Sequence, residues 1–279
     1  MSDVDIHEVM MDVFDDTVQQ YRNNPKLKAA IENTIKKTIV YGNDEIPSFE
    51  AINKKGELRV TSYRSFESAE KLLKEFKNKK VAVLNFASPI NPGGQVENGA
   101  LAQEECLCRI STLYPSLYNQ PVLKAYYYPN RQFGTFLADN KVIYSPGVVV
   151  FKKDILVPEM LEEKDFYSVD VITCAAPNYR KHMQWGKMVS SFTSYEDEYN
   201  IHVERARHII CSALANKVDI LVLGAFGCGA FQNHPEVVSK AYKDALKDYL
   251  QYFEVVEFAV YSRGAAIINY DTFKKVLLG

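Results

Sequence analysis

The pattern of apolar and polar positions changes once along the chain, near residue 50. Over residues 3–23 apolar side chains recur at helical spacing, and a second helical pattern covers residues 25–39, with proline in its first turn. Each pattern predicts an amphipathic helix whose apolar face packs on the rest of the chain. We therefore expect residues 1–50 to form an N-terminal helical extension and residues 51–279 to form the main domain.

From residue 57 onward, short apolar runs alternate with helical patterns. Besides a buried strand that begins at Val81, strands are expected at residues 58–62, 141–144, 148–152, 168–174, 219–223 and 255–261. Helices are expected at residues 65–77, after Gly99, at residues 196–216, after a cap at Asn233 or His234, and from about Asp271. This alternation predicts an α/β fold with three α/β/α layers around a central mixed, largely parallel sheet.

Two segments show little periodicity. Residues 111–134 form a Tyr-rich connection, and a loop of this length in a compact domain is usually functional or disordered. Its aromatic content argues against disorder. Residues 176–188 are expected to form a surface loop that carries the single Trp of the chain.

Composition excludes several classes of protein. A hydrophobic content of 47% and a net charge of −2 over 279 residues are ordinary for a globular protein and argue against a general nucleic-acid or membrane-surface binder. The first ten residues lack the basic and apolar regions of a signal peptide, and no apolar run approaches a membrane span. The five Cys residues form no CxxC pair, which fits a reducing compartment. We therefore expect a cytoplasmic protein.

The stretch from residue 81 to residue 105 joins a buried strand to a helix through a loop rich in proline and glycine. In α/β proteins this arrangement forms a ligand crevice at the carboxyl end of a strand. The opening turns of the helix carry Gln103, Glu104 and Glu105. These residues therefore add polar chemistry to the predicted crevice.

Glu104 and Glu105 are candidates for acid–base catalysis. Adjacent helical residues point about 100° apart, so only one of the two can face a given bond. A carboxylic acid in such a crevice can protonate the leaving oxygen of a glycosidic bond, provided that burial raises its pKa. The alternative interpretation is a pair of solvated acidic residues that the helix dipole stabilises.

A second glycine loop, residues 224–231, lies between the strand at 219–223 and a strongly periodic helix. Its glycines allow successive backbone N–H groups to point inward, which suits a phosphate or diphosphate. The loop matches neither the P-loop nor the full dinucleotide-binding pattern. A tight turn without a ligand is the alternative, and the presence of two such loops after buried strands favours a shared ligand cleft.

Taken together, the motifs resemble one known family. The sequence PGGQ…GALAQEE is preceded by VLNFAS and followed by CR-x-STLYPSL, and the segments TCAAPN and LGAFGCGAF follow later. This combination resembles the microbial type of poly(ADP-ribose) glycohydrolase, a macrodomain family with the signature Gly-Gly-Gly, six to eight residues, Gln-Glu-Glu. The resemblance covers nearly the whole chain from about residue 20. It implies a macrodomain-like catalytic domain at residues 51–279.

The resemblance also implies a role for individual residues. Glu105 would be the catalytic acid/base at the ribose–ribose O-glycosidic bond, and Glu104 would hold hydroxyls of the flanking riboses. Phe231 would pack against the terminal ribose, and backbone amides of the second glycine loop would bind the diphosphate. The residues expected to bind substrate are Asn85, Ala87, Ser88, Gly93, Gly94, Gln95, Gln103, Gly224, Gly227, Cys228, Gly229, Ala230 and Phe231. The adenine-binding residues are not placed, and an aromatic side chain near Tyr270 or Phe273 is a guess.

The implied reaction is hydrolysis of poly(ADP-ribose), mainly by removal of terminal ADP-ribose units. No cofactor and no metal are expected, and the five His residues show no metal-ligand spacing. Ordinary surface or cap positions are expected for them. The expected partners are poly(ADP-ribose) and ADP-ribosylated proteins, with ADP-ribose as product and with neither a membrane nor sequence-specific nucleic acid. A monomer is expected.

One position departs from the family signature, because Gln95 stands where the third glycine is expected. If that position requires a positive φ or close backbone approach, Gln costs roughly 1 kcal/mol or more and adds bulk beside the sugar. We therefore expect ADP-ribose binding with slower turnover, and we expect glycine at position 95 to raise the rate.

Two other functions remain open at this point. A binding module that recognises ADP-ribose but has lost turnover is one, and an enzyme that removes single ADP-ribose units from protein side chains is the other. The intact pair of Glu104 and Glu105 favours a hydrolase. Cys228 lies near a helix N-terminus and is a candidate nucleophile, but its place in a glycine loop favours a backbone role.

Overall fold

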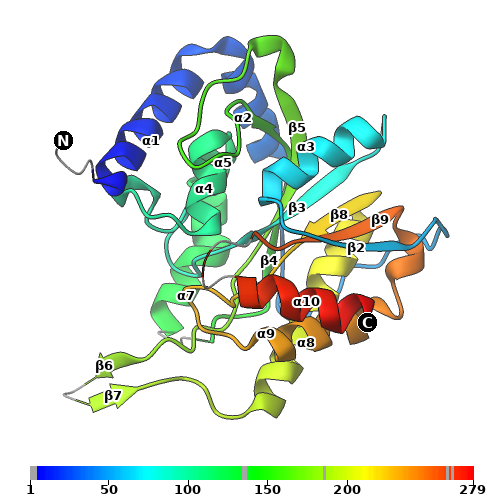
Figure 1. Cartoon of the computed structure of the whole chain (residues 1–279). Helices are drawn as coiled ribbons and strands as arrows, with labels where there is room; N and C mark the ends of the chain where they lie inside the picture. The colour runs from blue at the N-terminus through cyan, green and yellow to red at the C-terminus, as the bar shows by residue number, and fades with distance from the viewer. Residues whose placement is uncertain (1–4, 134–136, 185–186, 262–263, 265–266) are drawn as a thin grey trace.

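The computed structural model of the chain describes residues 5–133, 137–184, 187–261, 264 and 267–279. These residues form a seven-stranded sheet with the strand order β1-β4-β5-β3-β8-β9-β2 (Figure 1). The strands of this sheet are β1 Ile39–Tyr41, β2 Glu57–Thr61, β3 Val81–Phe86, β4 Val142–Val150, β5 Tyr167–Cys174, β8 Ile220–Leu223 and β9 Val255–Ala259.

The sheet is mixed and largely parallel. Strand β3 is parallel to β5 and β8, and β9 is parallel to β8 and β2, whereas β4 is antiparallel to both β1 and β5. The predicted macrodomain-type sheet is therefore confirmed. The carboxyl ends of β3, β8 and β9 meet at one edge, which is where a ligand crevice is expected.

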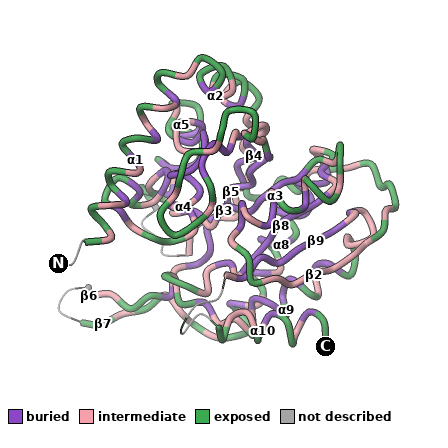
Figure 2. Tube along the Cα trace, turned by 45° about the horizontal axis from the view of Figure 1, so that its top comes forward, coloured by how far each residue is buried: buried purple, intermediate pink, exposed green. Residues whose placement is uncertain are grey.

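Helices cover both faces of the sheet (Figure 1). One layer contains α1 Ile6–Asn23, α2 Pro25–Lys37, α3 Ser65–Glu75, α4 Gln103–Ile110 and α5 Leu113–Leu117, and the other contains α8 Tyr195–Ala215, α9 Pro235–Leu246 and α10 Ile267–Leu278. Side chains of β3 alternate between the two layers. Val81 and Val83 belong to the core on the first face, and Ala82 and Leu84 belong to the core on the second. Figure 2 shows the resulting burial of the strands.

The N-terminal helices pack on the main domain. Phe14 of α1 meets Tyr114 edge to face, with ring centroids 5.1 Å apart. His7 Nδ1 lies 3.2 Å from Gly99 O, so α1 also contacts the loop that follows β3. The expected helical extension is therefore present as α1 and α2, and the division into residues 1–50 and 51–279 stays a prediction.

The prediction of a long loop without helical structure at residues 111–134 was wrong. Its described part folds into short helical turns that follow α5, namely α6 Gln120–Val122, the π-helical turn Leu123–Tyr127 and α7 Tyr128–Phe133. Tyr126 and Tyr127 are fully buried. These three elements follow one another without a break, and the π-helical stretch in the middle shifts the 3.6-residue period by which a helix is predicted from sequence.

Several boundaries also differ from the prediction. The strands expected at 141–144 and 148–152 are one strand, β4, interrupted by a bulge between Ser145 and Val148, and β1 was missed because three residues carry no pattern. The expected loop at 176–188 contains a hairpin of β6 His182–Gln184 and β7 Lys187–Val189, and Trp185 lies outside the described residues. Helix α10 begins at Ile267 rather than near Asp271.

Three 3-10 turns complete the described elements, η1 Val96–Asn98, η3 Glu163–Asp165 and η4 Leu250–Tyr252. Of the helices formed by the described residues, none has the length and apolar character that crossing a membrane demands.

Candidate active site

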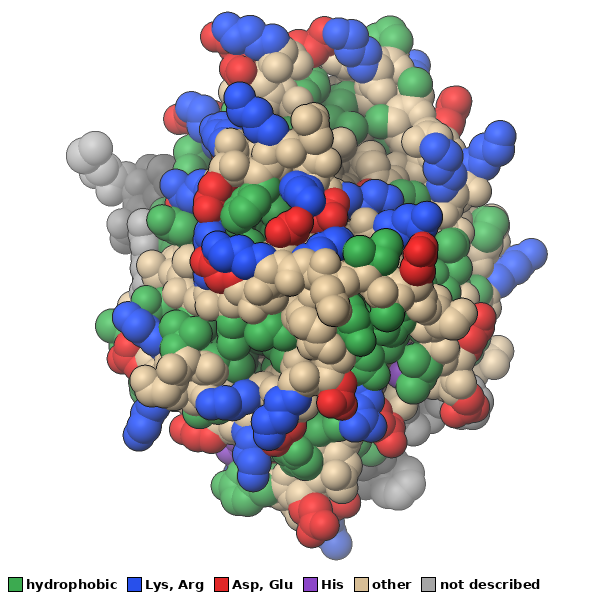
Figure 3. All heavy atoms as spheres, turned by 90° about the vertical axis from the view of Figure 1, so that its right-hand side faces the viewer, with side chains coloured by type: hydrophobic (Ala, Val, Ile, Leu, Met, Phe, Trp, Pro, Cys, Tyr) green, Lys and Arg blue, Asp and Glu red, His purple; other side chains and the backbone are tan. Residues whose placement is uncertain are grey.

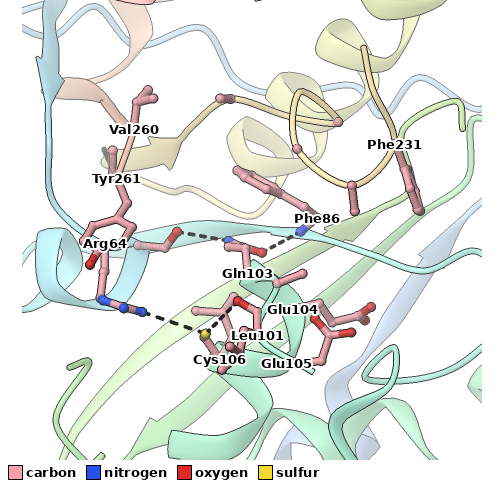
Figure 4. A pocket seen from close by; sticks show the side chains of 18 of the residues that line it. Arg64, Phe86, Leu101, Gln103, Glu104, Glu105, Cys106, Phe231, Val260 and Tyr261 are labelled. Carbon is pink, nitrogen blue, oxygen red and sulfur yellow. Dashed lines mark hydrogen bonds between the residues drawn. The ribbon is translucent and has the colours of Figure 1, made fainter. Parts of the chain in front are cut away.

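A pocket of about 410 Å³ opens at the carboxyl edge of the sheet. Its walls come from the loop after β3, the first turns of α4, the glycine loop after β8 and the end of β9 (Figure 4). Glu104, Glu105 and Phe231 lie at one end of the pocket, and Arg64 and Tyr261 lie at the other. The two segments that the sequence predicts to form one cleft therefore face each other.

The loop after β3 needs glycine at two positions. Gly93 has a φ of 70° and Gly94 a φ of 61°, which is left-handed backbone that disfavours side chains. A Cβ at position 93 would lie 2.6 Å from the ring of Tyr114, and a Cβ at position 94 would lie 2.2 Å from Oε1 of Glu105. The backbone of Gly94 thus passes directly against the catalytic candidate.

The carboxylate of Glu104 is buried and accepts three hydrogen bonds. Its Oε1 accepts from Asn85 Nδ2 and from Gly93 N, both at 3.2 Å, and its Oε2 accepts from Ser88 N at 2.7 Å. Burial is the largest influence on this group, and together with the negative charge of Glu105 it raises the pKa of Glu104 to about 8. The glutamate pair therefore holds a proton at neutral pH.

Glu105 is held by only one of its two oxygens. Its Oε1 accepts a hydrogen bond from the backbone N–H of Gln95 at 2.9 Å. Its Oε2 is buried and has no hydrogen-bond partner among the described residues. The side chain lines the pocket, so an acidic oxygen with no partner in the described part of the chain lies at the pocket wall (Figure 4).

Gln103 orients the start of α4. Its Oε1 accepts from the backbone N–H of Phe86 at 2.9 Å, and its Nε2 donates to Leu84 O at 2.8 Å and to Ser65 Oγ at 3.0 Å. These bonds tie the first turn of the helix to the end of β3. Gln103 lines the pocket, but its amide oxygen and nitrogen already form hydrogen bonds within the protein.

The predicted substrate-binding residues divide into two groups. Those that line the pocket are Ser88, Gln103, Gly227, Gly229, Ala230 and Phe231. Those that do not line it are Asn85, Ala87, Gly93, Gly94, Gln95, Gly224 and Cys228. Asn85 and Ala87 are completely buried, and Asn85 acts by donating to Glu104 and to Thr173 Oγ1.

The expectation of strain at position 95 was wrong. Gln95 has a φ of −114°, so its backbone conformation is open to any residue. Its side chain is exposed and accepts a hydrogen bond from Asn98 Nδ2 at 2.6 Å, so it adds no bulk beside the catalytic pair. Only the backbone N–H of Gln95 takes part in the site.

The second glycine loop closes the opposite wall. Gly227 has a φ of 77°, and a Cβ there would lie 2.6 Å from the Cβ of Ala176 and 2.7 Å from Nδ2 of Asn233. At Gly229 a Cβ would meet nothing within 4 Å. The N–H of Cys228 donates to Ala225 O at 3.1 Å, whereas the N–H groups of Gly229 and Ala230 have no partner among the described residues.

A buried amide holds this loop in place. Asn233 Nδ2 donates to Pro177 O at 2.7 Å and to Gly227 O at 3.0 Å, and Asn233 Oδ1 lies 2.7 Å from His202 Nε2. Burial lowers the pKa of His202 to about 3, so the ring is neutral and carries its proton on Nε2. This pair could not be predicted from the sequence, because Asn233 has the position of a helix cap and the two residues lie on separate elements.

The structure also tests the expected positions of the histidines and the candidate nucleophile Cys228. His202 and His208 are buried, contrary to the expected surface or cap positions. His234 does stand at the N-cap position of α9, and its Nδ1 lies 2.7 Å from Oε2 of the buried Glu198. Burial raises the pKa of the Cys228 thiol well above its usual range, which argues against a thiolate nucleophile.

The far end of the pocket contains charged and aromatic groups that sequence reasoning missed. The guanidinium of Arg64 lies 4.3 Å from the ring centroid of Tyr261, and its Nη1 lies 3.8 Å from Oδ1 of Asp154. Oδ2 of Asp154 accepts from the backbone N–H groups of Phe66 and Glu67 at 3.0 and 3.4 Å. Burial raises the pKa of Asp154 to about 6, although Arg64 opposes that shift.

Phe273 offers no face to adenine, because it is fully buried against Phe258, with ring centroids 5.8 Å apart. An adenine-binding aromatic side chain near Tyr270 stays a prediction, and the neighbouring Asn269 lines the pocket. Tyr261 is the aromatic residue that lines this end of the pocket. Among the described residues no group of His, Cys, Asp or Glu side chains could hold a metal ion.

A known protein family matches the part of the chain that contains the catalytic candidates. The family model described as "Microbial-type PARG, catalytic domain" matches residues 12–153, which include the first glycine loop and the glutamate pair. The chain belongs to this family. The resemblance noted in the sequence is therefore confirmed, and no curated protein matches the chain.

Solved structures of PARG are similar over nearly the whole chain. Poly(ADP-ribose) glycohydrolase from Thermomonospora curvata, bound to the inhibitor ADP-HPD, is 28% identical with a TM-score of 0.82, and the match covers 96% of this chain and 99% of that one. The enzyme from Deinococcus radiodurans in complex with ADP-ribose is 30% identical with a TM-score of 0.73, covering 89% and 96%.

Proposed function

We propose that this PARG-family chain hydrolyses the ribose–ribose O-glycosidic bonds of poly(ADP-ribose), with Glu105 as the acid/base. The reaction and the role of Glu105 are those that the resemblance to its family implies. One observation carries the assignment: Glu105 fixes one oxygen on Gln95 N and leaves the other, buried in the pocket, without a partner among the described residues. An acid/base needs such an oxygen within reach of the scissile bond.

In the proposed reaction, the proton of the glutamate pair passes from Glu105 to the leaving 2′-oxygen while the bond from that oxygen to C1″ breaks. Positive charge develops at C1″, and the nearby carboxylates stabilise it. A water molecule then attacks C1″ and returns a proton to Glu105. Glu104, which lines the pocket and is held by three donors, would accept hydrogen bonds from the ribose hydroxyls.

The remaining pocket suits the rest of one ADP-ribose unit. The N–H groups of Gly229 and Ala230 are available to a diphosphate, and Phe231 lies beside the glutamates where the terminal ribose would sit. The far end would take the adenosine, since Tyr261 offers an aromatic face and Arg64 offers donors. We further propose that the chain acts as a monomer in the cytoplasm on ADP-ribosylated proteins.

The decisive experiment measures release of ADP-ribose from purified poly(ADP-ribose). Wild type is expected to release ADP-ribose, and Glu105→Gln is expected to release none. Both proteins are expected to bind ADP-ribose. Glu236→Gln, which changes an exposed glutamate in the first turn of α9, is the control and should match wild type. Tight ADP-ribose binding by a wild type that releases nothing would instead indicate a binding module or a hydrolase of single ADP-ribose units.

A further inference from the structure

The hairpin of β6 and β7 projects from the rest of the chain (Figure 1). Residues 175–192 contain Arg180, Lys181 and Lys187 but no acidic residue. In the register of the hairpin Met183 pairs with Met188, so both side chains point to the same face. We name residues 180–184 and 187–189 the basic hairpin.

Among the residues that the structure describes, no acidic side chain pairs with the charges of the basic hairpin. Arg180, Lys181 and Lys187 are exposed, and within the described ranges none of them forms an ion pair. Elsewhere basic and acidic side chains are interspersed, as on the face in Figure 3, and the whole chain carries a net charge of only −2. A local excess of positive charge attracts polyanions.

The same segment exposes apolar surface. The side chains of Met183 and Met188 are 63% and 61% exposed, and they are among the most exposed large hydrophobic residues of the chain. Methionine is flexible and polarisable, which suits contact with varied or aromatic partners. Proteins bind single-stranded nucleic acid with positive charge along the backbone and aromatic side chains against the bases. Here the lysines and Arg180 supply the charge, and the two methionines supply an apolar surface for the bases.

The base of the basic hairpin is joined to the pocket. The backbone N–H of Tyr179 donates to Phe231 O at 2.9 Å, and Ser190 Oγ donates to Tyr179 O at 2.8 Å. Phe231 lines the end of the pocket that contains the glutamates. The four steps from Tyr179 to Met183 span roughly 13 Å at the rise of a strand, so the hairpin starts beside the catalytic end and leads outward.

We propose that the basic hairpin binds the part of poly(ADP-ribose) that lies beyond the scissile bond. The pocket would hold the terminal unit, and the hairpin would contact the diphosphates and adenines of the units on the leaving-group side. This inference rests on the proposed function. It adds a second contact with substrate, outside the pocket, that favours long polymer over short.

The test compares two double variants with the same change of charge. Lys181→Glu/Lys187→Glu reverses two charges of the basic hairpin. Lys36→Glu/Lys37→Glu reverses the charges of two exposed lysines in the last turn of α2. The hairpin variant is expected to raise KM for long polymer about ten-fold and to weaken its dependence on salt, with kcat within two-fold. The α2 variant should stay close to wild type, and both should bind ADP-ribose as wild type does.

Binding of labelled polymer to the same variants in the Glu105→Gln background separates this inference from the proposed function, because it requires no turnover. Equal loss of polymer binding in both double variants would overturn the inference, as would a parallel loss of ADP-ribose affinity in the hairpin variant. Tighter binding of single-stranded adenylate RNA than of poly(ADP-ribose) would assign the surface to nucleic acid instead. Failure of wild type to release ADP-ribose would count against the proposed function alone.

Discussion

Substitution of Gly94 by alanine tests the geometry of the site most directly. Two features make this position sensitive. Its φ of 61° disfavours any side chain, and the added Cβ would lie 2.2 Å from Oε1 and 2.9 Å from the carboxyl carbon of Glu105. The same Cβ would lie 3.2 Å from Oε2 of Glu104.

The two effects have different sizes. An alanine with positive φ costs about 1–2 kcal/mol of stability. The overlap requires a larger response, since ordinary contact begins at 3.4 Å and the carboxylate or the loop must move by about 1.2 Å, the difference between 3.4 and 2.2 Å. A misplacement of about 1 Å can cost roughly 100-fold in rate. We therefore expect Gly94→Ala to lower kcat about 100-fold or more.

The matched control is Gly147→Ala. Gly147, in the bulge of β4, has a φ of 70°, but a Cβ there would meet nothing within 4 Å. The two variants share the backbone strain, and only Gly94→Ala displaces the carboxylate. Initial rates of ADP-ribose release and free energies of unfolding from urea titrations, measured for both, separate the contributions.

Equal activity of folded Gly94→Ala and Gly147→Ala would refute the reasoning, because it would mean that the position of Glu105 does not limit the rate. A loss of activity in Gly94→Ala that simply follows its unfolded fraction would refute it as well. The expected result is similar stability for the two variants and a large difference in kcat.

Three further changes have defined outcomes. Gln95→Gly should leave the rate within two-fold and lower the free energy of unfolding by about 0.5–1 kcal/mol, because Gln95 is unstrained; a faster enzyme would contradict this. Because the pKa of Glu104 is raised to about 8 in the folded state, its contribution to stability is full below pH 4.5 and declines as pH rises to 8. In that window the free energy of unfolding of wild type should therefore fall relative to that of Glu104→Gln by up to about 1.4 kcal/mol per pH unit, as measured by denaturant titrations. An equal dependence on pH in the two proteins would contradict this. Asn233→Ala should raise KM about ten-fold with a smaller change in kcat, since it releases the carbonyl of Gly227, and calorimetry with ADP-ribose measures the loss directly.

The catalytic end of the site could be predicted from the sequence because its parts are contiguous. The glutamate pair and each glycine loop lie on single strand–loop–helix segments, and each segment carries its own local pattern. Parallel strands end at one edge of a sheet, so two such loops are expected to face each other. The sequence could not show that Glu104 and Glu105 differ in hydrogen bonding, since that depends on backbone N–H groups at residues 88, 93 and 95.

The far end of the pocket could not be predicted, because its residues are not contiguous in the sequence. Arg64, Asp154 and Tyr261 come from three segments separated by many residues, and none of them lies in a local motif. Asn233 and His202 form a buried pair across two elements, and only the packing of α8 against the glycine loop brings them together. Such contacts are decided by tertiary structure, which the pattern of one segment does not contain.

The requirement at position 95 is for a backbone donor and not for glycine. At Gly93 and Gly94 the chain is left-handed and passes so close to Tyr114 and Glu105 that a side chain has no room. At Gln95 the chain has returned to a negative φ, the side chain points to solvent, and the N–H donates to Glu105 Oε1. Every residue except proline supplies that N–H. A signature glycine can therefore be replaced here without loss of the catalytic geometry, whereas its two predecessors cannot.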